Sequence, residues 1–213
     1  LISTLCIYNF NTCISQTFTC GTRVNYQDHS YKTVQIGNQC WFAENLTATM
    51  NNLGEEIEIK QGKEEWVESK IEPAITFPSD AYRDKYGVLY NLNAVISNNI
   101  CPAGWHVPSL DDWTTLVNEL GGWEVSGYMM KSTSGWATTN NRTNISGFNA
   151  LPAGCRDHYG NFTFQGTGSY WWSTTIVTPM IDSWFCFIDD EKNDLIKYYF
   201  FNSFGFSVRC LED

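Results

Sequence analysis

The sequence predicts an α+β fold from the order of two kinds of pattern along its 213 residues. Helical periodicity occurs in the middle of the chain, near residues 86–97 and 109–120. The part after Gly147 consists of short apolar segments separated by turn residues, as expected of antiparallel strands. Eight cysteines, an even number, add a third observation, because small oxidised domains pair their cysteines.

Composition excludes three classes of protein. A net charge of −10 argues against nucleic-acid binding, which needs a basic surface. Aromatic residues make up 15% of the chain, which is too many for a disordered protein. The chain holds no apolar run of about twenty residues, so no membrane span is predicted.

The first predicted element is a hairpin. Residues 31–36 alternate apolar and polar side chains with the period of a strand, Gly37-Asn38 suits a tight turn, and residues 39–46 return as the second strand. The following stretch, about residues 51–80, is the most polar part of the chain. In it, Ile57 and Ile59 alternate with acids and precede a turn near Gly62, which predicts a surface hairpin with an acidic face.

Two helices are predicted next. Residues 86–97 place Leu89, Leu92 and Val95 on one side of a short helix. The second helix has stronger signals: Ser109 is a good N-cap with Asp112 three residues on, and an apolar stripe runs from Leu110 to Leu120 before Gly121-Gly122 ends it. Asp111 and Asp112 fall in the first turn, where the helix dipole favours negative charge, so they need no catalytic explanation.

The last third of the chain is predicted to be strand and turn. A turn at residues 157–160 separates residues 148–155 from a return at residues 161–164. Further strands are predicted at residues 170–175, 184–188, 196–201 and 206–210. The acidic segment 189–194 is then the tip of a hairpin.

The cysteines indicate an oxidising compartment. No CxxC pair is present and only three histidines occur, so disulfides are favoured over zinc. Residues 1–7 are apolar but lack the basic start and the cleavage site of a signal peptide, so the leader of this arm, residues 1–19, is expected to have been removed already. We expect this arm to be stapled by Cys6 and Cys13. It docks either on its own domain or on a neighbouring subunit by strand addition.

Seven blocks of sequence carry a resemblance to a known family. They are residues 32–46 (KTVQIGNQCWFAENL), 86–91 (YGVLYN), 101–109 (CPAGWHVPS) followed by Asp112 and Trp113, 131–136 (KSTSGW), 147–154 (GFNALPAG), 170–175 (YWWSTT) and 205–210 (GFSVRC). In this order they resemble the Fibrobacter succinogenes major paralogous domain. The resemblance covers residues 20–213, with the insert at about 51–80, and leaves residues 1–19 outside as a separate arm.

The resemblance implies a C-type-lectin-like fold on secreted or surface proteins of Bacteroidota and Fibrobacterota, in a family whose function is mostly unassigned. In such folds a disulfide ties the helical region to the last strand. Cys101 and Cys210 would form it, with Cys155–Cys186, Cys20–Cys40 and Cys6–Cys13 as the other pairs. Eight cysteines allow 105 connectivities, so these pairings remain a hypothesis.

No catalytic residue and no cofactor is predicted. The three histidines lie in separate segments, with His106 expected at a structural corner, and no phosphate loop or dinucleotide motif is present. The calcium-binding triplets of classical C-type lectins are also missing from the sequence. Asp189, Asp190 and Asp194 are weak candidates for calcium, because a solvated turn explains them more simply.

The aromatic residues of the late strands are the predicted ligand or interface residues. They are Tyr170, Trp171, Trp172, Trp184, Tyr198, Tyr199 and Phe200. Alternate residues of a strand face opposite sides, so about half of them must pack in the core. We therefore expect an extracellular or cell-surface protein that contacts copies of itself or another surface protein. In the sharpest form of this prediction it is a filament subunit, and the alternative is an adhesin or lectin-like module that binds glycans.

Overall fold

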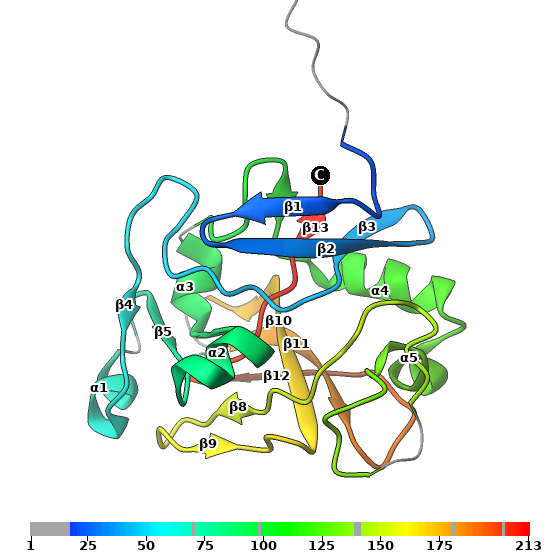
Figure 1. Ribbon diagram of the computed structural model, residues 1–213. Coiled ribbons are helices and arrows are strands. Elements are labelled where there is room, and N and C mark those ends of the chain that lie inside the picture. Colours follow the sequence, from blue (N-terminus) through cyan, green and yellow to red (C-terminus); the bar gives the residue numbers. More distant parts are fainter. Residues whose placement is uncertain (1–17, 70, 98, 139–141, 180–181, 202) are drawn as a thin grey trace, which may run out of the picture.

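The computed structural model describes residues 18–69, 71–97, 99–138, 142–179, 182–201 and 203–213 (Figure 1). The predicted arm at residues 1–19, with Cys6 and Cys13, lies almost wholly outside these residues. The described chain forms four β-sheets, most of whose pairings are antiparallel, and five short helices. The predicted α+β class is therefore confirmed.

A five-stranded sheet lies at the top of the molecule in Figure 1. Its order is β1 (Arg23–Tyr26), β2 (His29–Ile36), β3 (Gln39–Phe42), β13 (Leu211–Glu212) and β7 (Trp105–His106). The predicted hairpin is confirmed as β2 and β3, with Val34 opposite Trp41. The C-terminal strand enters this sheet between β3 and β7, and Leu211 pairs with both Trp41 and His106.

The second main sheet has three antiparallel strands in chain order, β10 (Gly168–Thr178), β11 (Asp182–Asp189) and β12 (Ile196–Phe201). Alternate residues of β10 and β11 pack into two different clusters of buried apolar side chains, one on each face of the sheet. Trp172 and Phe185, which are cross-strand partners, pack in one cluster, whereas Trp171 and Cys186, the next pair, pack in the other. This sheet is thus covered by apolar side chains on both faces.

Helices cover one side of each core. Helix α4 (Leu110–Glu119) begins at the predicted Ser109 cap and buries Trp113, Leu116 and Val117, and α5 (Trp123–Met130), which was not predicted, follows it. The helix predicted over residues 86–97 is only partly correct. The structure instead has α2 (Asp80–Tyr86), a short strand β6 (Leu89–Tyr90) and α3 (Leu92–Ser97).

The predicted acidic hairpin is wrong. Strand β4 (Glu58–Ile59) pairs in parallel with β5 (Ala74–Thr76), and α1 (Lys63–Glu68) lies between them. The helix forms because the Glu65 side chain accepts from the backbone N–H of Gly62, and because Trp66 is buried with its Nε1 donating to Ser203 O at 3.2 Å. Burial of one large ring outweighs the local strand pattern.

The remaining strands are short. β8 (Cys155–Arg156) and β9 (Phe162–Thr163) form the hairpin predicted around residues 157–160. The last strand was predicted at residues 206–210, but this segment forms only isolated bridges, and β13 follows it. Its backbone groups bond to Tyr90 and Tyr170, and those of Gly205, just before it, bond to Arg156.

Disulfides join Cys20 to Cys40 and Cys101 to Cys210, as the resemblance implied. The predicted disulfide between Cys155 and Cys186 is wrong, because both cysteines are free and buried. Cys155 packs in the same cluster as Trp172, and Cys186 packs in that of Trp171. The two thiols therefore lie on opposite sides of the second main sheet and cannot meet.

Candidate functional site

The predicted interface aromatics separate into buried and exposed groups. Trp171 and Trp172 are fully buried, so their prediction as interface residues is wrong. Tyr170 packs on Phe187 and Phe206 and is half-buried. These three rings belong to the cores because helices and loops cover both faces of β10, which a strand pattern alone does not reveal.

Strand β12 carries the exposed group. Tyr198 is 53% exposed and Tyr199 47% exposed, on opposite faces of the strand. Tyr199 makes an edge contact with Trp184 at 5.2 Å, and Tyr198 makes one with Phe185 at 6.1 Å. β12 is also the last strand of its sheet, so within the described residues its outer backbone edge pairs with no strand. We call Trp184 and β12 the aromatic edge.

The acidic loop between β11 and β12 is fixed by internal contacts. Lys131 is buried, and its Nζ donates to Lys192 O at 2.5 Å. Burial lowers the pKa of Lys131, and the carboxylates of Asp189, Asp190 and Asp194 act against this lowering. These acids therefore offset a buried cation. Across the described residues, no three His, Cys, Asp or Glu side chains converge as metal ligands.

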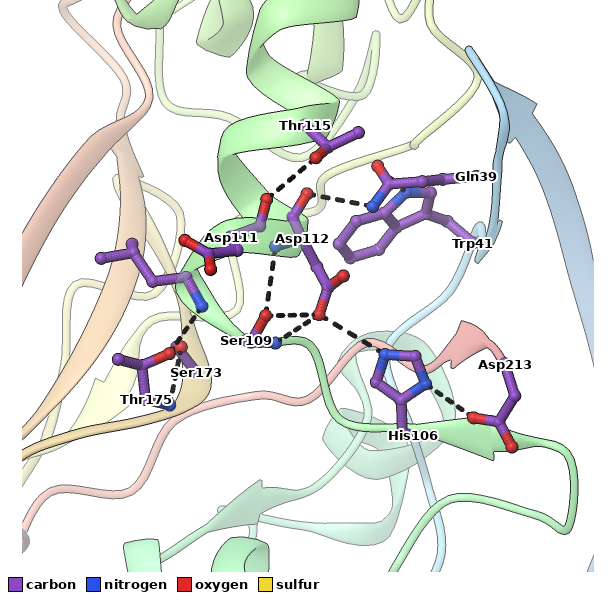
Figure 2. A network of polar contacts seen from close by, with 11 residues as sticks. Gln39, Trp41, His106, Ser109, Asp111, Asp112, Thr115, Ser173, Thr175 and Asp213 are labelled. Carbon is purple, nitrogen blue, oxygen red and sulfur yellow. Dashed lines mark hydrogen bonds and ion pairs between the residues drawn. The ribbon is translucent and has the colours of Figure 1, made fainter.

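His106 lies between two carboxylates at the entrance to α4 (Figure 2). Its Nδ1 lies 2.7 Å from Asp213 Oδ1 and its Nε2 lies 3.4 Å from Asp112 Oδ2. Ser109 Oγ donates to the same Asp112 oxygen at 2.6 Å, so the serine is bonded to the carboxylate rather than to the imidazole. The group ties α4 to the C-terminal strand, and the arrangement lacks the serine–histidine bond of a nucleophilic site.

The electrostatics of this group are those of an ion pair. The hydrogen bond from His106, together with those from Ser109, lowers the pKa of Asp112 to about 2. The hydrogen bond to Asp112 is the main cause that raises the pKa of His106, and burial acts in the other direction. Both shifts favour the charged pair at mildly acidic pH.

Two fully buried arginines organise the cores. Arg209 donates from Nε to Asn45 Oδ1 at 2.7 Å and from Nη1 to the carbonyls of Phe42 and Phe148. Arg156 donates to the carbonyls of residues 60–62 and 160 and to Thr76 Oγ1, which fixes the segment before α1. Burial lowers the pKa of Arg209 to about 9 and that of Arg156 to about 10, so both remain charged at neutral pH.

A polar cleft that the sequence did not predict opens beside Arg209. Residues of the β1–β2 turn, of segment 44–49 and of α2 line it, and Glu44 accepts from His29 there at 3.1 Å. These segments are far apart along the chain, so no local motif could have indicated the site.

Comparison with protein families identifies the chain. The model of the Fibrobacter succinogenes major domain matches residues 34–212. The chain belongs to this family. No curated protein and no solved structure matches it significantly.

The blocks that mark the Fibrobacter succinogenes major domain in this chain are mostly parts of its scaffold. Asn45, Lys131, Trp171 and Arg209 come from four of them and are all buried. The aromatic edge and the polar cleft also draw on residues outside these blocks, such as Tyr199 and Asp84. None of the described helices is long and apolar enough to cross a membrane.

Proposed function

We propose that this Fibrobacter succinogenes major domain is a non-catalytic protein of the cell surface or the extracellular space that acts through protein–protein contact. The aromatic edge carries the proposal. Exposed tyrosines on an edge strand offer both apolar area and, along the outer edge of β12, backbone hydrogen bonds to a partner.

The two disulfides support the compartment, because such bonds persist in oxidising surroundings. The long-range bond from Cys101 to Cys210 ties the segment before α4 to the C-terminal strand, and this supports a C-type-lectin-like fold. The free thiols of the described residues, Cys155 and Cys186, do not suit a catalytic role. Burial raises the pKa of Cys155 to about 12 and raises that of Cys186 as well.

In the specific form of the proposal, copies of the chain assemble into a filament. Residues 1–17 are rich in Ile, Tyr, Phe and Thr, which favour strands, and a fully extended chain of this length spans about 55 Å. The described chain starts where Phe18 contacts Trp105 of β7 at 5.3 Å, next to the five-stranded sheet, whereas β12 lies below that sheet in Figure 1. Strand addition of this arm to β12 of a second copy would give the backbone groups of the arm and of the outer edge of β12 hydrogen-bond partners.

The test is electron microscopy and light scattering of the full chain, of two double-substitution variants and of one deletion variant. We expect Tyr198→Lys with Tyr199→Lys, and deletion of residues 1–19, to abolish assembly. The matched control is Tyr128→Lys with Tyr159→Lys, which changes two exposed tyrosines outside β12. Monodisperse monomers of the unaltered chain, or equal assembly of all variants, would contradict the filament.

A second candidate function is adhesion through glycans. The polar cleft favours it, and selective, saturable binding on a glycan array would support it. Deletion of residues 1–19 is expected to leave such binding intact while abolishing assembly, which separates the two functions.

A further inference from the structure

We infer that the polar cleft is a binding site for a neutral sugar unit, held without a metal ion. The residues that line the cleft come mainly from the β1–β2 turn, segment 44–49 and α2. It consists of an inner and an outer hollow that share His29, Thr47 and Asp84 and are therefore continuous. It does not include the aromatic edge, so the inference rests on the second candidate function, glycan binding, and not on the assembly proposed above.

The charges in the cleft are balanced. Three carboxylates line it, those of Asp28, Glu44 and Asp84, and three permanent cations line it as well, those of Arg83, Lys85 and Arg209. A strongly charged ligand would meet repulsion from one set whichever sign it carried. A neutral ligand with many hydroxyl groups suits both sets, because a hydroxyl donates to a carboxylate and accepts from Arg83 or Lys85. The guanidinium of Arg209 contributes charge only, since its N–H groups already donate within the core.

The inner hollow also offers groups suited to the edge of a sugar ring. Asn149 brings an amide, while Tyr86 and Leu151 supply a small apolar area for C–H groups. Most other lining groups are polar, which disfavours an apolar ligand such as a lipid chain.

The walls of the cleft are held in place before any ligand binds. Gln27 has a φ of 50°, and its side chain donates to Met50 O at 2.7 Å and accepts from Thr49 N at 3.1 Å. Thr47 is fixed in the same way by Tyr31, whose hydroxyl lies 2.7 Å from Thr47 Oγ1 and accepts from the Thr47 N–H at 3.0 Å. Such preorganisation lowers the entropic cost of binding.

The floor of the cleft depends on a close approach of two segments. Gly87 has a φ of 86°, and a Cβ there would lie 2.7 Å from Asn45 Cβ and 2.8 Å from Leu46 O. Val88 N donates to Leu46 O at 2.9 Å and Asn45 Nδ2 donates to Tyr86 O at 2.8 Å. Helix α2 is thereby anchored to segment 44–49, so the two walls that carry Asp84 and Glu44 are held together.

The experiment uses the full ¹⁵N-labelled chain and a panel of methyl glycosides of common neutral hexoses, pentoses and N-acetylhexosamines. We expect saturable amide shifts at residues 27–29, 44–49 and 83–87 with at least one glycoside, unchanged when a chelator removes calcium. Asp84→Ala should weaken that binding about tenfold or more, the effect of losing a hydrogen bond to a charged group.

The matched control is Asp80→Ala, an exposed aspartate of the same helix that also lies near Arg83 but does not line the cleft. It should leave the affinity unchanged, and the spectra of both variants report whether the fold is intact. The inference is overturned by the absence of saturable shifts across the panel, by shifts that map to β12, or by equal losses in the two variants. Assembly measured by light scattering should not change in Asp84→Ala, so failure here and failure of the filament are distinguishable.

Discussion

Asn45 Oδ1 accepts a hydrogen bond from Arg209 Nε at 2.7 Å, across 164 residues of sequence. The same oxygen accepts from Trp171 Nε1 at 2.9 Å, so one amide joins segments from both ends of the chain and from β10. The guanidinium also lies over the Phe148 ring at 4.2 Å. A single polar group in the core thus fixes the relative position of three segments.

Arg209→Lys is expected to lower the free energy of unfolding by more than about 3 kcal/mol. A lysine cannot satisfy Asn45 and the carbonyls of Phe42 and Phe148 together, and each unsatisfied buried group costs about 1–3 kcal/mol. Urea unfolding followed by tryptophan fluorescence measures the change. Arg23→Lys, at an exposed arginine, is the control, and equal stabilities of the two variants would contradict a structural role for Arg209.

The two disulfides should differ in their contributions to stability. Cys101 and Cys210 are 109 residues apart and Cys20 and Cys40 are 20 apart, so the chain-entropy model assigns about 5 and about 3 kcal/mol to the two bonds. Cys101→Ser with Cys210→Ser should therefore destabilise the protein more than Cys20→Ser with Cys40→Ser. Urea unfolding compares the two double variants, and the reverse order would refute the entropic account.

Stability should depend on pH through His106. Its pKa is raised in the folded state, so its contribution is complete below the unfolded value of about 6.5 and is lost as the pH rises through the folded value. The pKa of Asp112 is lowered to about 2, so its contribution is present above about pH 4 and is lost as the pH falls toward 2. Melting temperatures should therefore be highest between these limits.

The matched pair for this prediction is Asp112→Asn and Asp111→Asn, which change neighbouring acids in the first turn of α4. Only Asp112→Asn should lower the pKa of His106 in an NMR titration and flatten the pH profile of the melting temperature. His106 is 40% exposed, so we expect a modest effect that salt weakens further. An identical titration of His106 in both variants would show that the pair with Asp112 does not form.

Cys155 and Cys186 should be unreactive toward thiol reagents in the native protein and reactive after denaturation. Both are buried, and burial raises the pKa of each thiol, so the thiolate is scarce. Alkylation followed by peptide mass spectrometry without reduction measures this for each cysteine. Recovery of a peptide that links Cys155 to Cys186 would contradict the arrangement of the cores.

Local signals predicted the β2–β3 hairpin and α4 correctly, since alternation and a capping box are complete within a few residues. They failed where distant contacts decide the structure. Residues 63–68 form a helix because Trp66 is buried beside Gly205 and Arg156, and α5 tolerates Gly127 because that glycine packs directly on the backbone of residues 193 and 194.

The candidate sites also divide into features that local sequence patterns predict and features that depend on distant contacts. The exposure of Tyr198 and Tyr199 agrees with the prediction from the late strands, because an edge strand leaves part of its side chains uncovered. Trp171 and Trp172 could not be assigned to the core from the sequence, since strand periodicity does not show that both faces of a sheet are covered. The polar cleft was missed because its three walls meet only in the folded chain.

The placement of β13 between β3 and β7 sets a limit on when the protein can fold. Leu211 must pair with Trp41 and with His106, so the five-stranded sheet stays open until the end of the domain has been synthesised. Contacts between segments so far apart form slowly, because a long loop has to close first. Cys210 directly precedes β13, so closure of this sheet and pairing of Cys210 with Cys101 belong to the same late step of folding.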